Sequence, residues 1–166
     1  MGLAALIVYV TLGRRRIDYR FVLLGAVLPD AVDAVVDIFI VTGPAGRSIA
    51  HSLLAVLAIT VAIVVIFRGE RRLAVFGLGV GWFLHLVGDG MWNAPKTFLW
   101  PAFGTDFAGR PREPYSIDLF VHPIDHLWTW GGEIVGLLIL VWFWVAFRLG
   151  QDGRARTFLR DGYLRP

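Results

Sequence analysis

Long apolar runs constrain the fold of this chain more than any other feature. Four runs lie near the ~20 residues that a helix needs to cross a bilayer, and a shorter fifth run is too short to cross alone at about 1.5 Å per residue. Apolar residues make up 57% of the chain, whereas about half or less is usual for a soluble domain. The sequence therefore predicts an all-α fold, a polytopic transmembrane helical bundle with four long spans and a short N-terminal apolar helix. The spans cover residues 20–42, 51–67, 73–92 and 127–147, and the short helix covers residues 1–12.

The basic residues predict how this bundle is oriented. Of the 16 Lys and Arg residues, twelve lie in three regions, namely residues 14–20, residues 68–72 and the tail from Arg148. The other four lie in the intervening connections, and the two sets alternate along the chain as the connections of a membrane bundle do. Because cytoplasmic connections carry the excess of Lys and Arg, we expect the rich set in the cytoplasm. The net charge of +3 is then a matter of topology, and nucleic acid is not an expected partner.

This orientation divides the chain. We expect one membrane-embedded helical domain over residues 1–150, in the inner or plasma membrane, with a loop outside over residues 93–122 and a basic cytoplasmic tail over residues 151–166. The loop is about 30 residues long, and loops of that length are often functional. Its mixture of Lys96 with aromatic residues suits the headgroup layer, so it is expected to cover a site or to form an aromatic belt.

The ionisable residues of the apolar runs gather at the expected outer ends of the helices. All four histidines lie there, although the charge count did not use them. The chain has no cysteine, which excludes disulfides, thiolate nucleophiles and cysteine–zinc sites. The residues concerned are Asp30, Asp33, Asp37, His51, His85, Asp89, His122, Asp125 and His126.

Spacing indicates which of these side chains share a helix face. Asp30 and Asp33 are three residues apart, and His85 and Asp89 are four apart, so each pair shares one face. Gly77, Gly81 and Gly88 continue the second face, and small residues at such spacing let a neighbouring helix approach closely. Ionisable groups inside spans are costly and are functional by default, which favours a role for Asp30, His51, His85 and Asp89. Asp37, His122 and Asp125 lie near enough to the interface to face water instead.

Three motifs resemble those of a known family. They are "LGAVLPDAVD" at residues 24–33, "RSIAHSLL" at residues 47–54 and "FLHLVGDGMWNAPKTFLWP" at residues 83–101. In this order they resemble the YdjM-like membrane-bound metal-dependent hydrolases, which are LexA-regulated inner-membrane proteins. The resemblance implies that Asp30 and Asp33 match a PDxxD element, His51 a His-Ser element, and His85 and Asp89 an HxxxD element.

Residue chemistry and resemblance together predict a metal centre near the outer leaflet. Two imidazoles and two carboxylates suit a divalent ion, most simply zinc or manganese, held by Asp30, His51, His85 and Asp89. Asp33 is expected to be catalytic, as the general base or a further ligand. Acidified water would then attack an ester or phosphoester of a membrane lipid or other amphipathic substrate. Further candidates at the site are His126, Glu133 and Arg47, of which Arg47 is placed to meet an anionic headgroup.

Two other classes of function remain open from the sequence. An ion or proton transporter would use the same acidic residues and histidines as a pathway, with Glu133 deeper in the last helix. A non-catalytic membrane protein would hold a structural metal with four protein ligands and no open position. The oligomeric state is left open.

Overall fold

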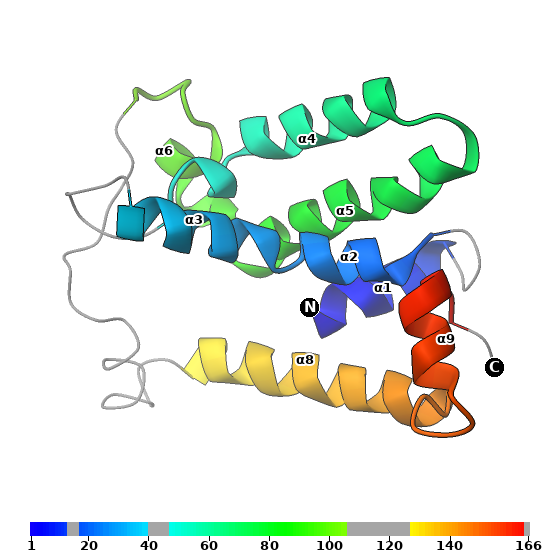
Figure 1. Ribbon diagram of the computed structural model, residues 1–166. Coiled ribbons are helices and arrows are strands. Elements are labelled where there is room, and N and C mark those ends of the chain that lie inside the picture. The colour runs from blue at the N-terminus through cyan, green and yellow to red at the C-terminus, as the bar shows by residue number, and fades with distance from the viewer. Residues whose placement is uncertain (13–16, 40–46, 106–126, 165–166) are drawn as a thin grey trace.

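The computed structural model describes residues 1–12, 17–39, 47–105 and 127–164 (Figure 1). Every regular element in these ranges is a helix, and no strand occurs in them. The prediction of an all-α fold is therefore confirmed. The elements are α1 (Gly2–Leu12), α2 (Tyr19–Gly25), α3 (Leu28–Phe39), the 3-10 turn η1 (Ile49–His51), α4 (Leu53–Ile66), α5 (Gly69–Gly88), the 3-10 turn η2 (Met91–Asn93), α6 (Pro95–Phe98), α8 (Leu127–Ala146) and α9 (Arg154–Asp161).

The helices follow the apolar runs with one division. The run over residues 20–42 forms two helices, α2 and α3, which meet at Ala26 and Val27. Pro29 lies in the first turn of α3, where its missing N–H is not needed. Among the residues that the structure describes, no helix combines the length and the apolar character of a membrane-crossing segment. The prediction of four spanning helices is thus not confirmed.

Glycine lets α2 and α5 pack with their backbones almost in contact. A Cβ on Gly81 would collide with the carbonyl oxygen of Val22, and one on Gly25 would collide with that of Leu78. A Cβ on Gly77 would come within 2.9 Å of the Ile17 side chain. These positions confirm the expected packing role of Gly77 and Gly81. Gly88 is different, since a Cβ there would meet nothing within 4 Å, so the packing role predicted for it is wrong.

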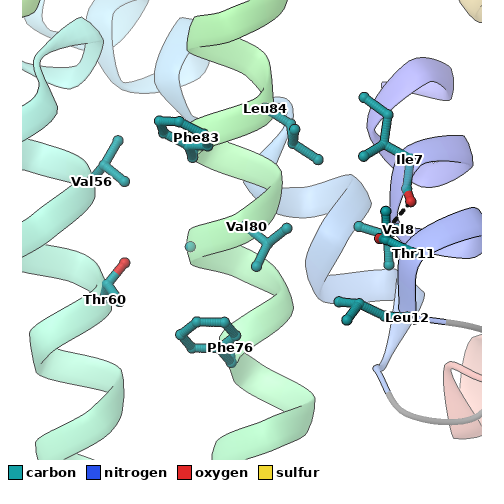
Figure 2. A pocket seen from close by; sticks show the side chains of 11 residues that line it. Ile7, Val8, Thr11, Leu12, Val56, Thr60, Phe76, Val80, Phe83 and Leu84 are labelled. Atoms are coloured by element: carbon teal, nitrogen blue, oxygen red, sulfur yellow. Dashed lines mark hydrogen bonds between the residues drawn. The ribbon is translucent and has the colours of Figure 1, made fainter.

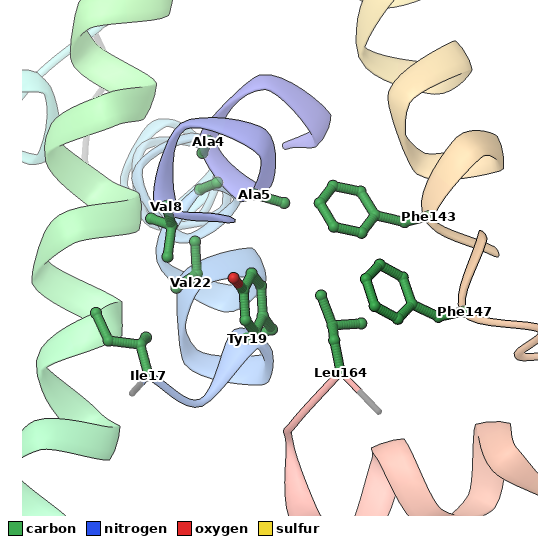
Figure 3. Close-up of a cluster of buried hydrophobic side chains, with 10 residues drawn as sticks. Ala4, Ala5, Val8, Ile17, Tyr19, Val22, Phe143, Phe147 and Leu164 are labelled. Carbon is green, nitrogen blue, oxygen red and sulfur yellow. The ribbon is translucent and has the colours of Figure 1, made fainter. Parts of the chain in front are cut away.

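A buried apolar cluster joins α1, α2 and α8 to the C-terminal tail. Figure 3 shows Phe143 of α8 and Phe147, the residue after α8, pointing toward the helices at the N-terminus, with Leu164 beside them. Tyr19 is also fully buried in this cluster, and burial raises the pKa of its phenol to about 12. The tail is held in place by Arg20, whose Nη1 donates to the carbonyl oxygens of Leu159 and Arg160 at 2.8 and 2.7 Å.

A second buried cluster fixes η1 against α5. It consists of Ala50, Val56, Trp82, Leu86 and Met91. The indole Nε1 of Trp82 donates to the carbonyl oxygen of Ala50 at 2.8 Å. Because Ala50 lies inside η1, this bond places the 3-10 turn directly beside the C-terminal half of α5.

The structure has an apolar pocket of about 290 Å³ between α1, α4 and α5. Figure 2 shows Phe83 of α5 on the side toward Val56 of α4, with Leu84 on the side toward α1. None of the four predicted metal ligands lines this pocket. It is therefore separate from the polar site.

The two ends of the bundle are formed by different elements. The connection between α4 and α5 and the tail helix α9 lie at one end (Figure 1). At the opposite end lie η1, the C-terminus of α5 and α6 (Figure 1). The polar residues discussed next all lie at this second end.

Candidate metal centre

Four ionisable side chains from three separate elements come together at one end of the bundle. Asp30 lies in the first turn of α3, His51 ends η1, His85 lies in the last turn of α5, and Asp89 is the C-cap of α5. Each of the four offers one ligand atom, and these atoms all lie within 4.8 Å of one another. The structure thus gathers the residues that the sequence predicts as metal ligands, while metal binding itself stays a prediction.

Five of the six separations between the ligand atoms, those that involve a histidine, lie between 3.3 and 3.8 Å. His51 Nε2 lies 3.3 Å from His85 Nε2. Asp30 Oδ1 lies 3.4 Å from the Nε2 atom of each histidine. Asp89 Oδ2 lies 3.6 Å from His51 Nε2 and 3.8 Å from His85 Nε2.

These separations match a small tetrahedral ion. Zinc binds imidazole nitrogen and carboxylate oxygen at ~2.0–2.1 Å, so the edges of a regular tetrahedron of such ligands are about 3.3–3.4 Å. Three of the separations fall in that range and the two to Asp89 are a few tenths longer. The donor set of two imidazoles and two carboxylates is also one that zinc and manganese accept. The residues therefore fit a divalent ion both in chemistry and in spacing.

Asp33 lies behind His51, where it holds the imidazole in place. Its Oδ2 is 2.7 Å from His51 Nδ1. Because a carboxylate only accepts, Nδ1 carries the proton, and in the neutral imidazole the lone pair on Nε2 then faces the other ligands. This is the carboxylate–histidine arrangement that orients many metal ligands. Asp33 is buried.

Ser48 and Ala50 complete the hydrogen bonding of Asp33. The Ser48 backbone N–H donates to Oδ2 at 2.6 Å, and the Ser48 hydroxyl donates to Oδ1 at 2.5 Å. The Ala50 N–H donates to Oδ1 at 3.3 Å. Both carboxylate oxygens are thus engaged by the segment that leads into η1. These contacts favour a positioning role for Asp33 over the ligand or base role predicted for it.

The two serines around His51 have different partners. Ser48 anchors Asp33 as described, whereas Ser52 is the N-cap of α4 and its Oγ accepts from the Ala55 N–H at 3.1 Å. The Ser52 hydroxyl also donates to the carbonyl oxygen of Ile49 at 2.7 Å. The capped start of α4 follows His51 directly, and Ser48, which binds the Asp33 carboxylate, precedes it. These contacts on both sides leave the His51 imidazole little freedom.

Arg47 forms an ion pair at the edge of the group. Its Nη2 donates to Asp89 Oδ2 at 2.6 Å. This is the same oxygen that faces the two histidines. Arg47 thus holds Asp89 from the outer side.

The two carboxylates of the group are more exposed to solvent than the two imidazoles. The side chains of His51 and His85 are 1% and 10% exposed, whereas those of Asp89 and Asp30 are 26% and 65% exposed. The imidazoles form the closed side and the carboxylates form the open side. A ligand from outside would therefore approach past Asp30 and Asp89.

The sequence comparison now assigns the family. The YdjM inner membrane protein family matches residues 1–155. This chain belongs to that family. It is accordingly a protein of the inner membrane, as the sequence predicted. No curated protein and no solved structure matches it.

Of the further candidates for the YdjM-family site, Arg47 borders this group, whereas Glu133 does not belong to it. Glu133 is exposed on α8 and is absent from the cluster of potential ligands found among the described residues. His126, His122 and Asp125 lie outside the described residues. Their predicted roles stay predictions.

Sequence reasoning missed Ser48 and Trp82 as parts of the site. Ser48 carries no periodic signal, and its role appears only once Asp33 is known to be buried. A buried carboxylate needs donors, so a serine three residues before His51 was a usable hint. Trp82 precedes His85 by three residues, and this spacing places it near the same end of α5.

Proposed function

We propose that this protein is a membrane-bound, metal-dependent hydrolase that acts on an ester or phosphoester of a lipid or other amphipathic substrate at the outer leaflet. The observation that carries the proposal is the convergence of four ligand atoms, all within 4.8 Å of one another, at one end of the bundle. Zinc is the ion that these separations favour, with manganese as the second choice.

The ligand residues have distinct tasks in this proposal. His51 and His85 bind the ion from the closed side, and Asp33 keeps the His51 Nε2 lone pair directed at it. Asp89 is the third ligand. A bound divalent ion would polarise the scissile group and lower the pKa of water toward about 7.

Asp30 is the residue that we assign to proton transfer. Its side chain is 65% exposed, and its Oδ1 lies 3.4 Å from both imidazole Nε2 atoms. A carboxylate in that position can take a proton from water as the water oxygen bonds to the acyl carbon or phosphorus, and return it to the leaving alkoxide. Asp30 would thus supply the proton-accepting carboxylate, while His51, His85 and Asp89 would hold the ion.

The surface of the bundle supports placement in the bilayer. Large apolar side chains are exposed along α4 and α8. The basic α4–α5 connection and α9 lie at the end opposite to the polar group (Figure 1). By the positive-inside rule, we place that basic end, with the C-terminus, in the cytoplasm, and the polar group toward the outer face of a multi-pass protein.

The direct test is metal analysis and lipid hydrolysis with purified protein in detergent. We expect about one zinc or manganese ion per chain, released hydrolysis products from a lipid ester panel by mass spectrometry, and loss of both in His85→Ala. Hydrolysis that persists after removal of the ion by a chelator would contradict the proposal.

A structural metal is the one alternative with a specific observation in its favour, because four protein ligands can fill a tetrahedral zinc site. Asp30→Asn distinguishes the two. The catalytic proposal expects this variant to keep its ion through the other three ligands while hydrolysis falls by about 10²–10⁴-fold, the usual contribution of a positioned base. A structural ion would be accompanied by no hydrolysis in the unaltered protein.

A further inference from the structure

Arg47 is a cationic group on the open side of the candidate metal centre. Its Nη2 donates to Asp89 Oδ2, and that oxygen lies 3.6 Å from His51 Nε2. Its side chain is 42% exposed. The guanidinium therefore borders the route by which a substrate would reach the ligand atoms.

The ion pair between Arg47 and Asp89 is easily exchanged for another partner. Ion pairs with this degree of exposure contribute little to stability, because water screens them. Within the described part of the chain, the Arg47 side chain makes its hydrogen bond to Asp89, whereas a guanidinium carries five N–H donors. An incoming anion can therefore bind the remaining donors, or replace Asp89, at little cost.

The position of Arg47 indicates which substrate suits this place. Asp30 and Asp89 would neutralise a divalent ion, and Asp33 lies behind His51, where it is engaged by the donors of Ser48, Ala50 and His51. Arg47 is the cationic side chain that borders the open side of the group. A neutral carboxyl ester has no charge for it to meet, whereas a phosphate group presents two oxygens that match the planar guanidinium.

We propose that Arg47 binds the phosphate group of the substrate, so that the substrates of this centre are anionic phosphate esters and not neutral carboxyl esters. On binding, the guanidinium moves part or all of its hydrogen bonding from Asp89 to the phosphate oxygens. The inference rests on the proposed function, because it names the substrate class of the same centre.

The test measures phosphate binding in place of turnover. Zinc-loaded full-length protein in detergent would be titrated by calorimetry with inorganic phosphate and, separately, with a short-chain phosphatidic acid. We expect Arg47→Gln to weaken binding at least tenfold and Arg47→Lys to weaken it less, with zinc content unchanged in both. Arg72→Gln is the matched control, since Arg72 is exposed, donates to the carbonyl oxygen of Phe67 at 2.9 Å and belongs to the opposite end of the bundle.

The outcomes separate this inference from the proposed function. Absence of zinc from the unaltered protein would remove the proposed function itself. If the unaltered protein binds zinc but Arg47→Gln binds phosphate equally well, the inference alone is overturned. A loss of zinc in Arg47→Gln would also overturn it, because Arg47 would then be a support for Asp89. Weakening seen only with phosphatidic acid would support a lipid phosphate, and weakening with both ligands would support recognition of the phosphate wherever it comes from. Failure of both ligands to bind the zinc-loaded protein would also overturn it.

Discussion

Replacing Asp33 by asparagine tests the hydrogen-bonded support of His51. The amide can keep its oxygen at the Oδ2 position, where His51 Nδ1 and the Ser48 N–H donate at 2.7 and 2.6 Å. Its NH₂ group then takes the Oδ1 position, where it can donate to the Ser48 hydroxyl, and only the long 3.3 Å bond from Ala50 is lost. The shape of the site is kept and the negative charge behind the imidazole is removed.

The magnitude follows from what the charge does for the ligand. Outer carboxylates that orient a ligating histidine typically contribute 10–100-fold to metal affinity, which corresponds to about 1.4–2.7 kcal/mol. We expect Asp33→Asn to raise the dissociation constant for zinc by that factor. Asp33→Ala should do more harm, because it leaves the buried donors of His51 and Ser48 without an acceptor, at about 1–3 kcal/mol for each.

The assay is competition for zinc against a chelator of known affinity, with thermal unfolding recorded in parallel. Asp152→Asn serves as the control, because Asp152 is exposed, lies far along the chain from the site and has a positive φ of 50° that asparagine tolerates. A zinc affinity in Asp33→Asn equal to that of the unaltered protein would refute the positioning role. Complete loss of zinc, as in a ligand variant, would instead make Asp33 a direct ligand.

Three further predictions address the ligands, the packing and the topology. His85→Ala should abolish measurable zinc binding by metal analysis; unchanged zinc content would exclude the centre as described. Gly81→Ala should lower the free energy of unfolding by about 1–3 kcal/mol in denaturant titrations, because the added Cβ collides with backbone. Gly88→Ala is the control, since a Cβ at Gly88 meets open space and should not destabilise the protein. Equal effects of the two substitutions would refute the packing argument. Cysteines introduced at Thr105 and Arg156 should react with an impermeant reagent from opposite sides of the membrane, and labelling of both from one side would contradict the proposed orientation.

The group of four ligand candidates was predictable because ionisable side chains are conspicuous in apolar helices. Helical spacing placed His85 and Asp89 on one face, and the alternation of basic connections placed Asp30 and His51 at the same end. Helical spacing depends only on neighbouring residues, and the orientation depends only on a count of basic residues in each connection. Both can therefore be obtained from a single sequence. In the structure, the four potential ligand atoms of these residues lie within 4.8 Å of one another.

The connections inside the site were not predictable in the same way. The ion pair between Arg47 and Asp89 joins residues 42 positions apart, and the bond from Ser48 to Asp33 spans 15 positions. Short polar side chains and single arginines give no periodic pattern, so helical spacing does not indicate which partners they have in the folded chain. The same reasoning explains Asp33, whose spacing from Asp30 fits a ligand but whose position on the helix turns it toward Ser48 and His51.

The metal centre also depends on packing that lies outside it. His85 follows Gly81 by one helical turn on α5, and Asp30 belongs to α3, which continues from α2 after a break of only two residues. Glycines at the α2–α5 crossing remove the side chains that would otherwise hold the two backbones apart. A wider crossing would move α3, and Asp30 with it, away from His85, whereas the two ligand atoms now lie 3.4 Å apart. The close approach of two apolar helices therefore sets the distance across the candidate centre, and a change at Gly81 should reach the ligands without touching them.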